Sequence, residues 1–202
     1  MCLVIQRDTI QTAKLVATLD QVSGGRFLFG IGGGWNQEEM EDHGTEFKTR
    51  FKRMREQVEA MPAIWTEEEP EYHGEIIDFP KMRAWPEPVQ KPHPPVIVGG
   101  AFPHSARRAI RYGGGWVPNA SRPAYADITD FLPQFREMAA QAGRDPASLS
   151  ITIFGAGDDA DRLARYRDRG IARAVVMLPS ADTAAVEPIL DRWAELIRRT
   201  TH

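Results

Sequence analysis

The sequence contains one cysteine, Cys2, among its 202 residues. A single cysteine excludes an intrachain disulfide framework and is typical of proteins in a reducing compartment. The sequence also lacks any apolar run that approaches the roughly 20 residues needed for a membrane helix, and its first residues do not have the pattern of a signal peptide. We therefore expect a soluble, cytoplasmic protein with no membrane partner.

A strong charge of either sign is also missing, since the formal net charge is -3 and the pI is about 6.0. Nucleic-acid-binding domains carry clustered positive charge, so we expect no nucleic-acid partner. The densest arginine region, residues 162–173, is interleaved with Asp161 and Asp168. This alternation of charge is typical of a solvated helix face.

Motifs for metal binding or nucleophilic catalysis are absent as well. The histidines are scattered without the spacing of metal ligands, so we predict no metal site and assign no catalytic residue. His104 and Arg107 stand out only because they follow a glycine pair, where a cation could face a phosphate; a surface position is the competing interpretation. The five histidines are His43, His73, His93, His104 and His202.

The sequence does contain short apolar runs that end in glycines. The first run, residues 27–31, is continuously apolar, as expected of a strand that is buried on both faces in a parallel sheet. Its last residues lead into Gly32, Gly33, Gly34 and Trp35. Main-chain N–H groups without side chains around them can approach a ligand closely, and an indole offers a flat face. A tight turn with a packing tryptophan explains the same residues equally well.

A second apolar run, residues 94–98, has the same kind of ending, and a helical pattern begins soon after it. A third set, residues 113–118, has its glycines first, so we interpret it as a turn followed by a strand that contains Trp116. The carboxyl ends of parallel strands deliver their loops to one edge of a sheet, where α/β proteins bind ligands. Trp35 and Trp116 are candidates to stack on a bound ring or simply to pack. The second run ends in Val98, Gly99, Gly100 and Ala101.

Strand and helix patterns alternate along the chain, which predicts an α/β fold with a parallel sheet of about six strands. Residues 66–94 follow neither pattern, and we interpret them as an excursion over the strand ends. Thr12 is the expected cap of the first helix. The predicted strands cover residues 2–5, 27–31, 94–98, 116–118, 149–154 and 174–178. The predicted helices cover residues 13–22, 38–64 with a break before residue 45, 105–110, 129–142, 159–169 and 184–198.

In order and spacing, these segments resemble the bacterial luciferase-like monooxygenase family across nearly the whole chain. The resemblance is carried by residues 13–26, 27–35, 94–100 and 115–118. The Gly-Trp loop and the Ala-Gly-Arg-Asp-Pro turn at residues 142–146 resemble the branch that uses the deazaflavin coenzyme F420. Other members of the family use FMN.

The resemblance implies a single TIM (β/α)8-type barrel domain over residues 1–202, with the cofactor at the carboxyl ends of the strands. It places the cofactor ring near the barrel axis, with residues 32–35 near the ring or its side chain. The phosphate lies against the loop of Gly99 and Gly100, and bare N–H groups before a helix suit a phosphate oxygen. Residues 66–94 correspond to a variable insertion that shapes the substrate pocket. The cofactor-binding residues implied in this way are Gly32, Gly33, Gly34, Trp35, Val98, Gly99, Gly100 and Ala101.

The sequence departs from the family because two strand–helix units that precede residue 2 in the family are missing. A barrel needs its eight strands to close, so we expect an N-terminally truncated barrel with two exposed edges. We interpret the chain either as a fragment or as a shortened homologue that pairs with another chain. A homo-oligomer is the expected state.

These observations predict an oxidoreductase that transfers a hydride between F420, or a flavin, and a small organic substrate. In such chemistry the cofactor carries the hydride, and the protein supplies position and electrostatics. The alternatives are an FMN-dependent monooxygenase and a non-catalytic truncated barrel that acts as a subunit or partner. A nucleotide-binding open sheet is disfavoured, because the glycines do not form a Gly-x-Gly-x-x-Gly fingerprint with an acidic residue at dinucleotide spacing.

Overall fold

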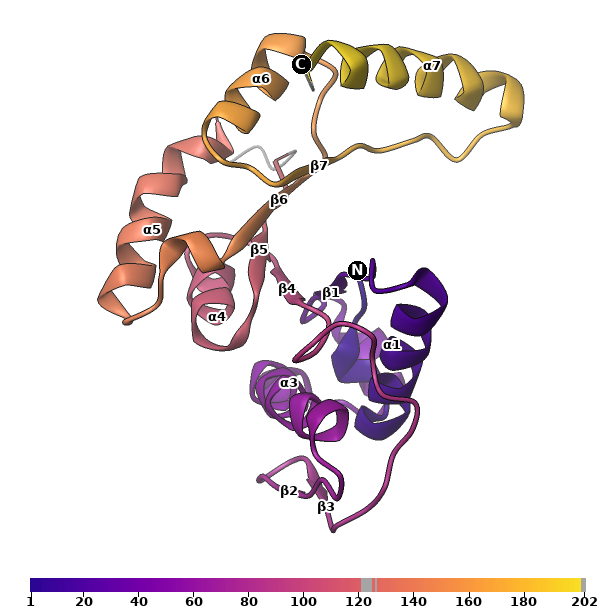
Figure 1. Cartoon of the computed structure of the whole chain (residues 1–202), viewed down its shortest axis with the longest axis vertical. Helices are drawn as coiled ribbons and strands as arrows, with labels where there is room; N and C mark the ends of the chain where they lie inside the picture. Colours follow the sequence, from indigo (N-terminus) through magenta and orange to yellow (C-terminus); the bar gives the residue numbers. More distant parts are fainter. Residues whose placement is uncertain (121–124, 126, 201–202) are drawn as a thin grey trace.

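The computed structural model describes residues 1–120, 125 and 127–200. Its centre is a five-stranded parallel sheet in the order β1-β4-β5-β6-β7, and Figure 1 shows helices along one side of it. Strands that are consecutive along the chain and joined by helices lie side by side, as in a βα-repeat fold. The strands are β1 (Phe29–Ile31), β4 (Val96–Gly99), β5 (Gly115–Val117), β6 (Ser150–Phe154) and β7 (Arg173–Val175).

The helices agree with the predicted alternation of elements. The long pattern over residues 38–64 is divided before residue 45, as predicted, into two α-helices with a 3-10 turn between them. No helix in the described part of the chain is both long enough and apolar enough to cross a membrane. The α-helices are α1 (Thr9–Ser23), α2 (Gln37–Asp42), α3 (Arg50–Thr66), α4 (His104–Tyr112), α5 (Leu132–Gln141), α6 (Ala160–Asp168) and α7 (Thr183–Thr200). The 3-10 turns are η1 (Val4–Gln6), η2 (Phe47–Thr49), η3 (Ile128–Phe131) and η4 (Pro146–Ser148).

The first segment of the chain differs from the prediction of a strand over residues 2–5. Only Cys2 pairs with the sheet, through a parallel bridge to Ile31, and η1 follows at once. Val4 and Ile5 are fully buried, so their apolar character reflects a buried turn. Short apolar runs do not distinguish these two cases, and the sheet has five strands and a bridge in place of six strands.

The start of α1 also differs from the prediction, because Asp8 caps this helix in place of Thr12. The Asp8 carboxylate accepts a hydrogen bond from the Gln11 N–H at 2.7 Å. The Thr12 hydroxyl instead donates to the Asp8 carbonyl within the helix, at 2.6 Å. A helix cap is the last residue before the first turn, and an aspartate there satisfies N–H groups that have no partner in the helix.

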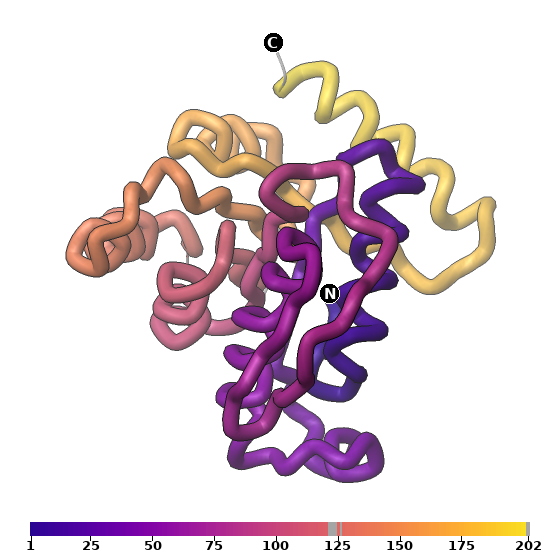
Figure 2. Tube along the Cα trace, turned by 60° about the horizontal axis from the view of Figure 1, so that its bottom comes forward, coloured from indigo at the N-terminus to yellow at the C-terminus, as the bar shows by residue number. Residues whose placement is uncertain are grey.

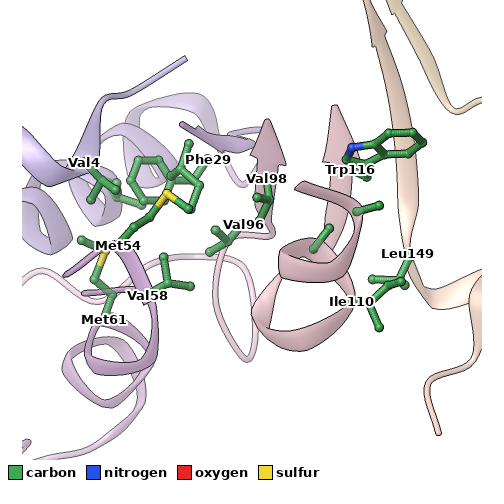
Figure 3. Packing of buried hydrophobic residues seen from close by; sticks show 14 of the residues in the cluster. Val4, Phe29, Met54, Val58, Met61, Val96, Val98, Ile110, Trp116 and Leu149 are labelled. Atoms are coloured by element: carbon green, nitrogen blue, oxygen red, sulfur yellow. The ribbon is translucent and has the colours of Figure 1, made fainter. Parts of the chain in front are cut away.

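The core lies between the sheet and the helices on that side. Figure 3 shows Met54, Val58 and Met61 of α3 packed toward Phe29 and Val96 of the sheet. Farther along the sheet, Trp116, Ile110 and Leu149 form the same layer. The indole Nε1 of Trp65 donates to the Ala13 carbonyl at 2.9 Å and joins α3 to α1.

We predicted that residues 66–94 cross the carboxyl ends of the strands. In the structure they lie elsewhere. Because α3 runs back along the sheet, its last turn and the start of β4 both lie at the edge where the strands begin. The Gln90 side chain donates to the Phe27 carbonyl just before β1 and to the Asp20 carboxylate near the end of α1. Figure 2 shows this segment as a magenta tube that runs along α3 and returns toward α1.

The middle of this segment is a small antiparallel hairpin of β2 (Tyr72–His73) and β3 (Asp78–Phe79). Glu56 of α3 attaches the hairpin, because its buried carboxylate accepts the N–H groups of Ile76 at 2.8 Å and Ile77 at 3.0 Å. Burial opposes ionisation of Glu56. The two N–H groups and the charges of Lys52 and Arg55 outweigh burial, so the pKa of this carboxyl is lowered.

The Ala-Gly-Arg-Asp-Pro turn at residues 142–146 lies at the same edge, where the strands begin, because α5 also runs back along the sheet. Arg144 Nη1 donates to the carbonyls of Ile110 at 2.9 Å and Gly113 at 3.1 Å. It therefore satisfies carbonyl groups at the end of α4 that have no partner in the helix. The turn has a structural function, and it lies away from the glycine loops at the strand ends.

We expect Glu56→Gln to destabilise the fold by about 1–3 kcal/mol at pH 7, since the amide loses charge-assisted hydrogen bonds to the hairpin. A carboxyl whose pKa is lowered on folding adds stability above its ordinary pKa of 4.5, and that stability is lost as the pH falls through the lower folded value. Urea unfolding between pH 7 and pH 3 should therefore show the difference between wild type and variant shrinking below pH 4.5. The exposed Glu67→Gln is the control, and an equal loss in it would contradict this account.

We expect Arg144→Met to lower the free energy of unfolding by about 1–2 kcal/mol, because two carbonyls at the end of α4 lose their donor while the aliphatic packing is kept. Chemical denaturation followed by circular dichroism measures the difference. Arg165→Met removes the same charge from an exposed site on α6 and should change stability by less than about 0.5 kcal/mol. Wild-type stability in Arg144→Met would show that the capping bonds contribute nothing.

Candidate functional site

The register of two strands brings the two glycine loops together. β1 and β4 pair in parallel, with Ile31 opposite Val98, so Gly32 and Gly99 are neighbours at the edge where both strands end. We call this edge the carboxyl edge of the sheet. The loops that the sequence singled out therefore converge on one place, and do not lie at opposite ends of the molecule.

The side chain of Met1 rests on both loops. A Cβ atom added to Gly99 would lie 2.4 Å from Met1 Sδ, and one added to Gly32 would lie 3.0 Å from the same sulfur. The first distance is too short for a side chain and the second is tight, so a residue larger than glycine would require the flexible Met1 side chain to move. Glycine at both positions keeps a flat, bare main-chain surface at this edge. Met1 itself is 66% exposed, and its unbranched thioether side chain adapts easily to a neighbouring group.

The other two glycines of the first loop are required by the protein's own packing. A Cβ on Gly33 would lie 2.4 Å from the Phe51 ring. Gly34 has a φ of +63°, and a Cβ there would lie 2.5 Å from Met40 Cε. For Gly33 and Gly34, the tight turn that we had weighed against a ligand site is a sufficient explanation.

The second loop connects the carboxyl edge to the start of α4. Gly100 has a φ of +133°, which strongly favours glycine. The Ala101 carbonyl accepts both the N–H and the hydroxyl of Ser105 at 2.9 Å. Among the described residues no acceptor faces the Ala101 N–H, and the positive end of the α4 dipole lies next to it. The Val98 side chain is fully buried, so only its main chain belongs to this edge.

The two tryptophans have different roles. Trp35 follows the first loop and is 85% exposed, so its indole is free to cover a bound group. Trp116 is fully buried, and its ring stacks on Phe135 with the centroids 5.1 Å apart. Its Nε1 donates to the Ser105 hydroxyl at 2.9 Å. For Trp116 the packing interpretation is therefore the right one.

Thr152 of β6 is a polar residue that the sequence reasoning missed. It is buried, and its hydroxyl makes no hydrogen bond within the described part of the chain. Ile151 and Ile153 belong to the core under the helices, so strand alternation turns Thr152 to the opposite face of the sheet. The only signal in the sequence is that the hydroxyl residues Ser150 and Thr152 alternate with apolar residues in this strand.

The titratable residues do not form a catalytic cluster at the carboxyl edge. His104 and Arg107 are exposed on α4, and Arg107 lines a cavity between α3 and α4. Burial raises the pKa of the half-buried Cys2 thiol against the opposing charge of Arg7, so this thiol stays protonated near neutral pH. No group of three or more His, Cys, Asp or Glu side chains in the described residues has the arrangement of a metal site.

A family model for luciferase-like monooxygenase matches residues 1–189. An uncharacterized protein of Mycobacterium tuberculosis strain H37Rv is 39% identical over 188 residues, which is 92% of this chain and 65% of that protein. An F420-dependent hydroxymycolic acid dehydrogenase of the same strain is 28% identical over 96% of this chain and 56% of its own length. An FMNH2-dependent dimethylsulfone monooxygenase of Pseudomonas putida is 28% identical over 76% of this chain and 42% of its own length.

Two solved structures share the fold. A monooxygenase of Streptomyces bottropensis superposes with a TM-score of 0.65 at 24% identity, over 95% of this chain and 58% of that one. An F420-dependent secondary alcohol dehydrogenase superposes with a TM-score of 0.62 at 18% identity, over 97% of this chain and 69% of that one. These matches confirm the predicted TIM-barrel class, although the described sheet itself is not closed.

The chain spans about two thirds or less of the length of the curated relatives that it matches. The relatives include enzymes named for F420 and for FMNH2, so a deazaflavin or flavin cofactor is the property that they share. The matched family model covers nearly the whole chain, and the uncharacterized Mycobacterium tuberculosis protein is 39% identical to it. The chain therefore belongs to the luciferase-like monooxygenase family.

Proposed function

We propose that this chain carries the cofactor-binding edge of an oxidoreductase that transfers a hydride between coenzyme F420 and a small organic substrate. The observation that supports it is the pairing of Ile31 with Val98, which brings Gly32 and Gly99 side by side. An enzyme of this kind needs a bare surface for a flat ring beside donors for a phosphate. The carboxyl edge offers both.

The residues present fit such a cofactor. Met1 already occupies the surface over Gly32 and Gly99 in the way that an apolar ring would. The Ala101 N–H and the start of α4 offer a donor and a positive dipole to a phosphate oxygen. We infer that the ring replaces the exposed Met1 side chain and that the phosphate lies against the Gly100 loop.

The remaining residues would orient the cofactor and exclude water. The Trp35 indole would cover the exposed face of the ring, and the Thr152 hydroxyl would be a donor or acceptor on the inner face of the sheet. When bound, the deazaflavin or flavin supplies the hydride chemistry. The protein's contribution is position and electrostatics.

F420 is favoured over FMN by two observations. The F420-dependent relative aligns over 96% of this chain and the FMNH2-dependent one over 76%, at equal identity. The Gly-Trp loop resembles the F420-using branch. An FMN-dependent monooxygenase is the alternative activity, and a non-catalytic subunit is the alternative of another class.

A homo-oligomer in the cytoplasm is part of the proposal. All three residues of β7 are exposed, and β7 is one end of the sheet. Strand edges of this kind tend to be covered by another chain. The single cysteine supports a reducing compartment.

We expect the purified chain to bind F420 more tightly than FMN in fluorescence titrations of the ring. Gly99→Ala should weaken binding at least tenfold, or about 1.4 kcal/mol, because its Cβ takes up the bare surface. Gly114→Ala is the matched control at the opposite edge, where the nearest atom to an added Cβ is 3.4 Å away. Tighter binding of FMN would favour the monooxygenase alternative, and binding of neither would favour the non-catalytic subunit.

We expect Trp35→Ala to weaken cofactor binding by about tenfold, since stacking on an aromatic face contributes roughly 1–3 kcal/mol. Trp35→Phe should keep most of the affinity. Trp85→Ala removes another exposed indole, 60% exposed, from the segment at the opposite edge, and it should bind like wild type. Equal affinities for Trp35→Ala and wild type would exclude a role for Trp35 in covering the ring.

A further inference from the structure

A cavity of about 600 Å³ lies between α3 and α4, on the helix side of the sheet and outside the proposed cofactor edge. We call it the α3/α4 cavity. Phe51 forms part of its wall and also contacts Gly33 of the first loop. Its volume lies in the range of small-molecule sites, and it is largely open to solvent. Five cationic side chains line it, namely Lys52, Arg55, Arg107, Arg108 and Arg111.

The carboxylates near this cavity are already in use. Glu75 pairs with Lys52. Glu56 holds the hairpin and lies 3.7 Å from Arg55, and Glu59 accepts the Tyr72 hydroxyl and lies 3.6 Å from Arg55. Within the described ranges, Arg107, Arg108 and Arg111 have no ion pair. The cavity therefore carries positive charge that the protein does not neutralise.

Two guanidinium groups lie close to the Phe51 ring in the wall of this cavity. The Arg108 Cζ lies 3.7 Å from the centroid of Phe51, and the Arg50 Cζ lies 4.3 Å from it. Burial lowers the pKa of both groups, and the charge of Arg50 lowers the pKa of Arg108 further. The nearby charge of Arg50 disfavours the charged form of Arg108, so an anion beside Arg108 would be favourable.

A buried donor in the cavity wall lacks an acceptor. The Tyr112 hydroxyl makes no hydrogen bond in the described structure, and neither does Arg50 Nε, whose guanidinium lies beside the Phe51 ring. Burial is the largest cause that raises the pKa of Tyr112 to about 12, so its hydroxyl remains a donor at neutral pH. A buried donor without a partner is costly, so a ligand oxygen that reached the Tyr112 hydroxyl would be favourable.

We propose that the α3/α4 cavity binds an organic oxyanion with at least two negative charges, either a phosphate compound or a polycarboxylate. Arginine forks bind both groups with paired hydrogen bonds. Arg107 and Arg111 would hold the outer charge, while Arg108 and Tyr112 would hold the inner one. This site is separate from the proposed cofactor edge and does not depend on it.

Calorimetric titration of the full 202-residue chain, without any flavin, tests this site. The probes are pyrophosphate, tricarballylate and monovalent acetate at one ionic strength. We expect pyrophosphate, tricarballylate or both to bind and acetate not to bind. The combined variant Arg107→Gln and Arg111→Gln should weaken binding by about tenfold or more, because charge-assisted contacts are lost.

The matched control is Arg165→Gln with Arg173→Gln, which removes the same charge from exposed sites on α6 and β7. It should bind like wild type. All four substituted arginines are exposed, so circular dichroism should show folded variants. No binding of either multivalent probe, or an equal loss in both double variants, would overturn the proposal. Because no flavin is present, failure of the cofactor proposal would leave this result unchanged.

Discussion

The parallel pairing of β1 with β4 is the constraint on which the candidate site depends. Parallel strands joined by a helix end at the same edge, so the register of Ile31 with Val98 brings two distant glycine loops together. The crossover contains α2 and α3, and α3 packs Met54, Val58 and Met61 toward the sheet. Burial of this apolar stripe stabilises the register that forms the edge.

The predictable part of the fold is the part with clear hydrophobic periodicity. The alternation of elements, the break before Thr45 and the parallel sheet were predicted, because strands and helices differ in the spacing of their buried residues. The prediction of a strand over residues 2–5 was wrong, because a buried turn is as apolar as a strand. The predicted course of residues 66–94 was wrong for a topological reason. A segment between a helix and the next parallel strand lies at the edge where the strands begin.

The sequence predicted the location of the candidate site better than it predicted the role of each residue there. Glycine runs marked the carboxyl edge, but sequence cannot distinguish Gly99, whose neighbour is the exposed Met1 side chain, from Gly33, whose neighbour is the Phe51 ring. Trp35 and Trp116 look alike in sequence and differ completely in exposure. Thr152 and the arginines of the α3/α4 cavity depend on tertiary placement, which no local pattern records.

The hydrogen bonds around Ser105 have a consequence for how the second loop would bind. The buried Trp116 indole donates to the Ser105 hydroxyl, which in turn donates to the Ala101 carbonyl. A buried tryptophan thus fixes the loop through Ser105. Such a loop is preorganised, because packing in the protein core determines its conformation. It therefore loses little conformational entropy when a ligand binds.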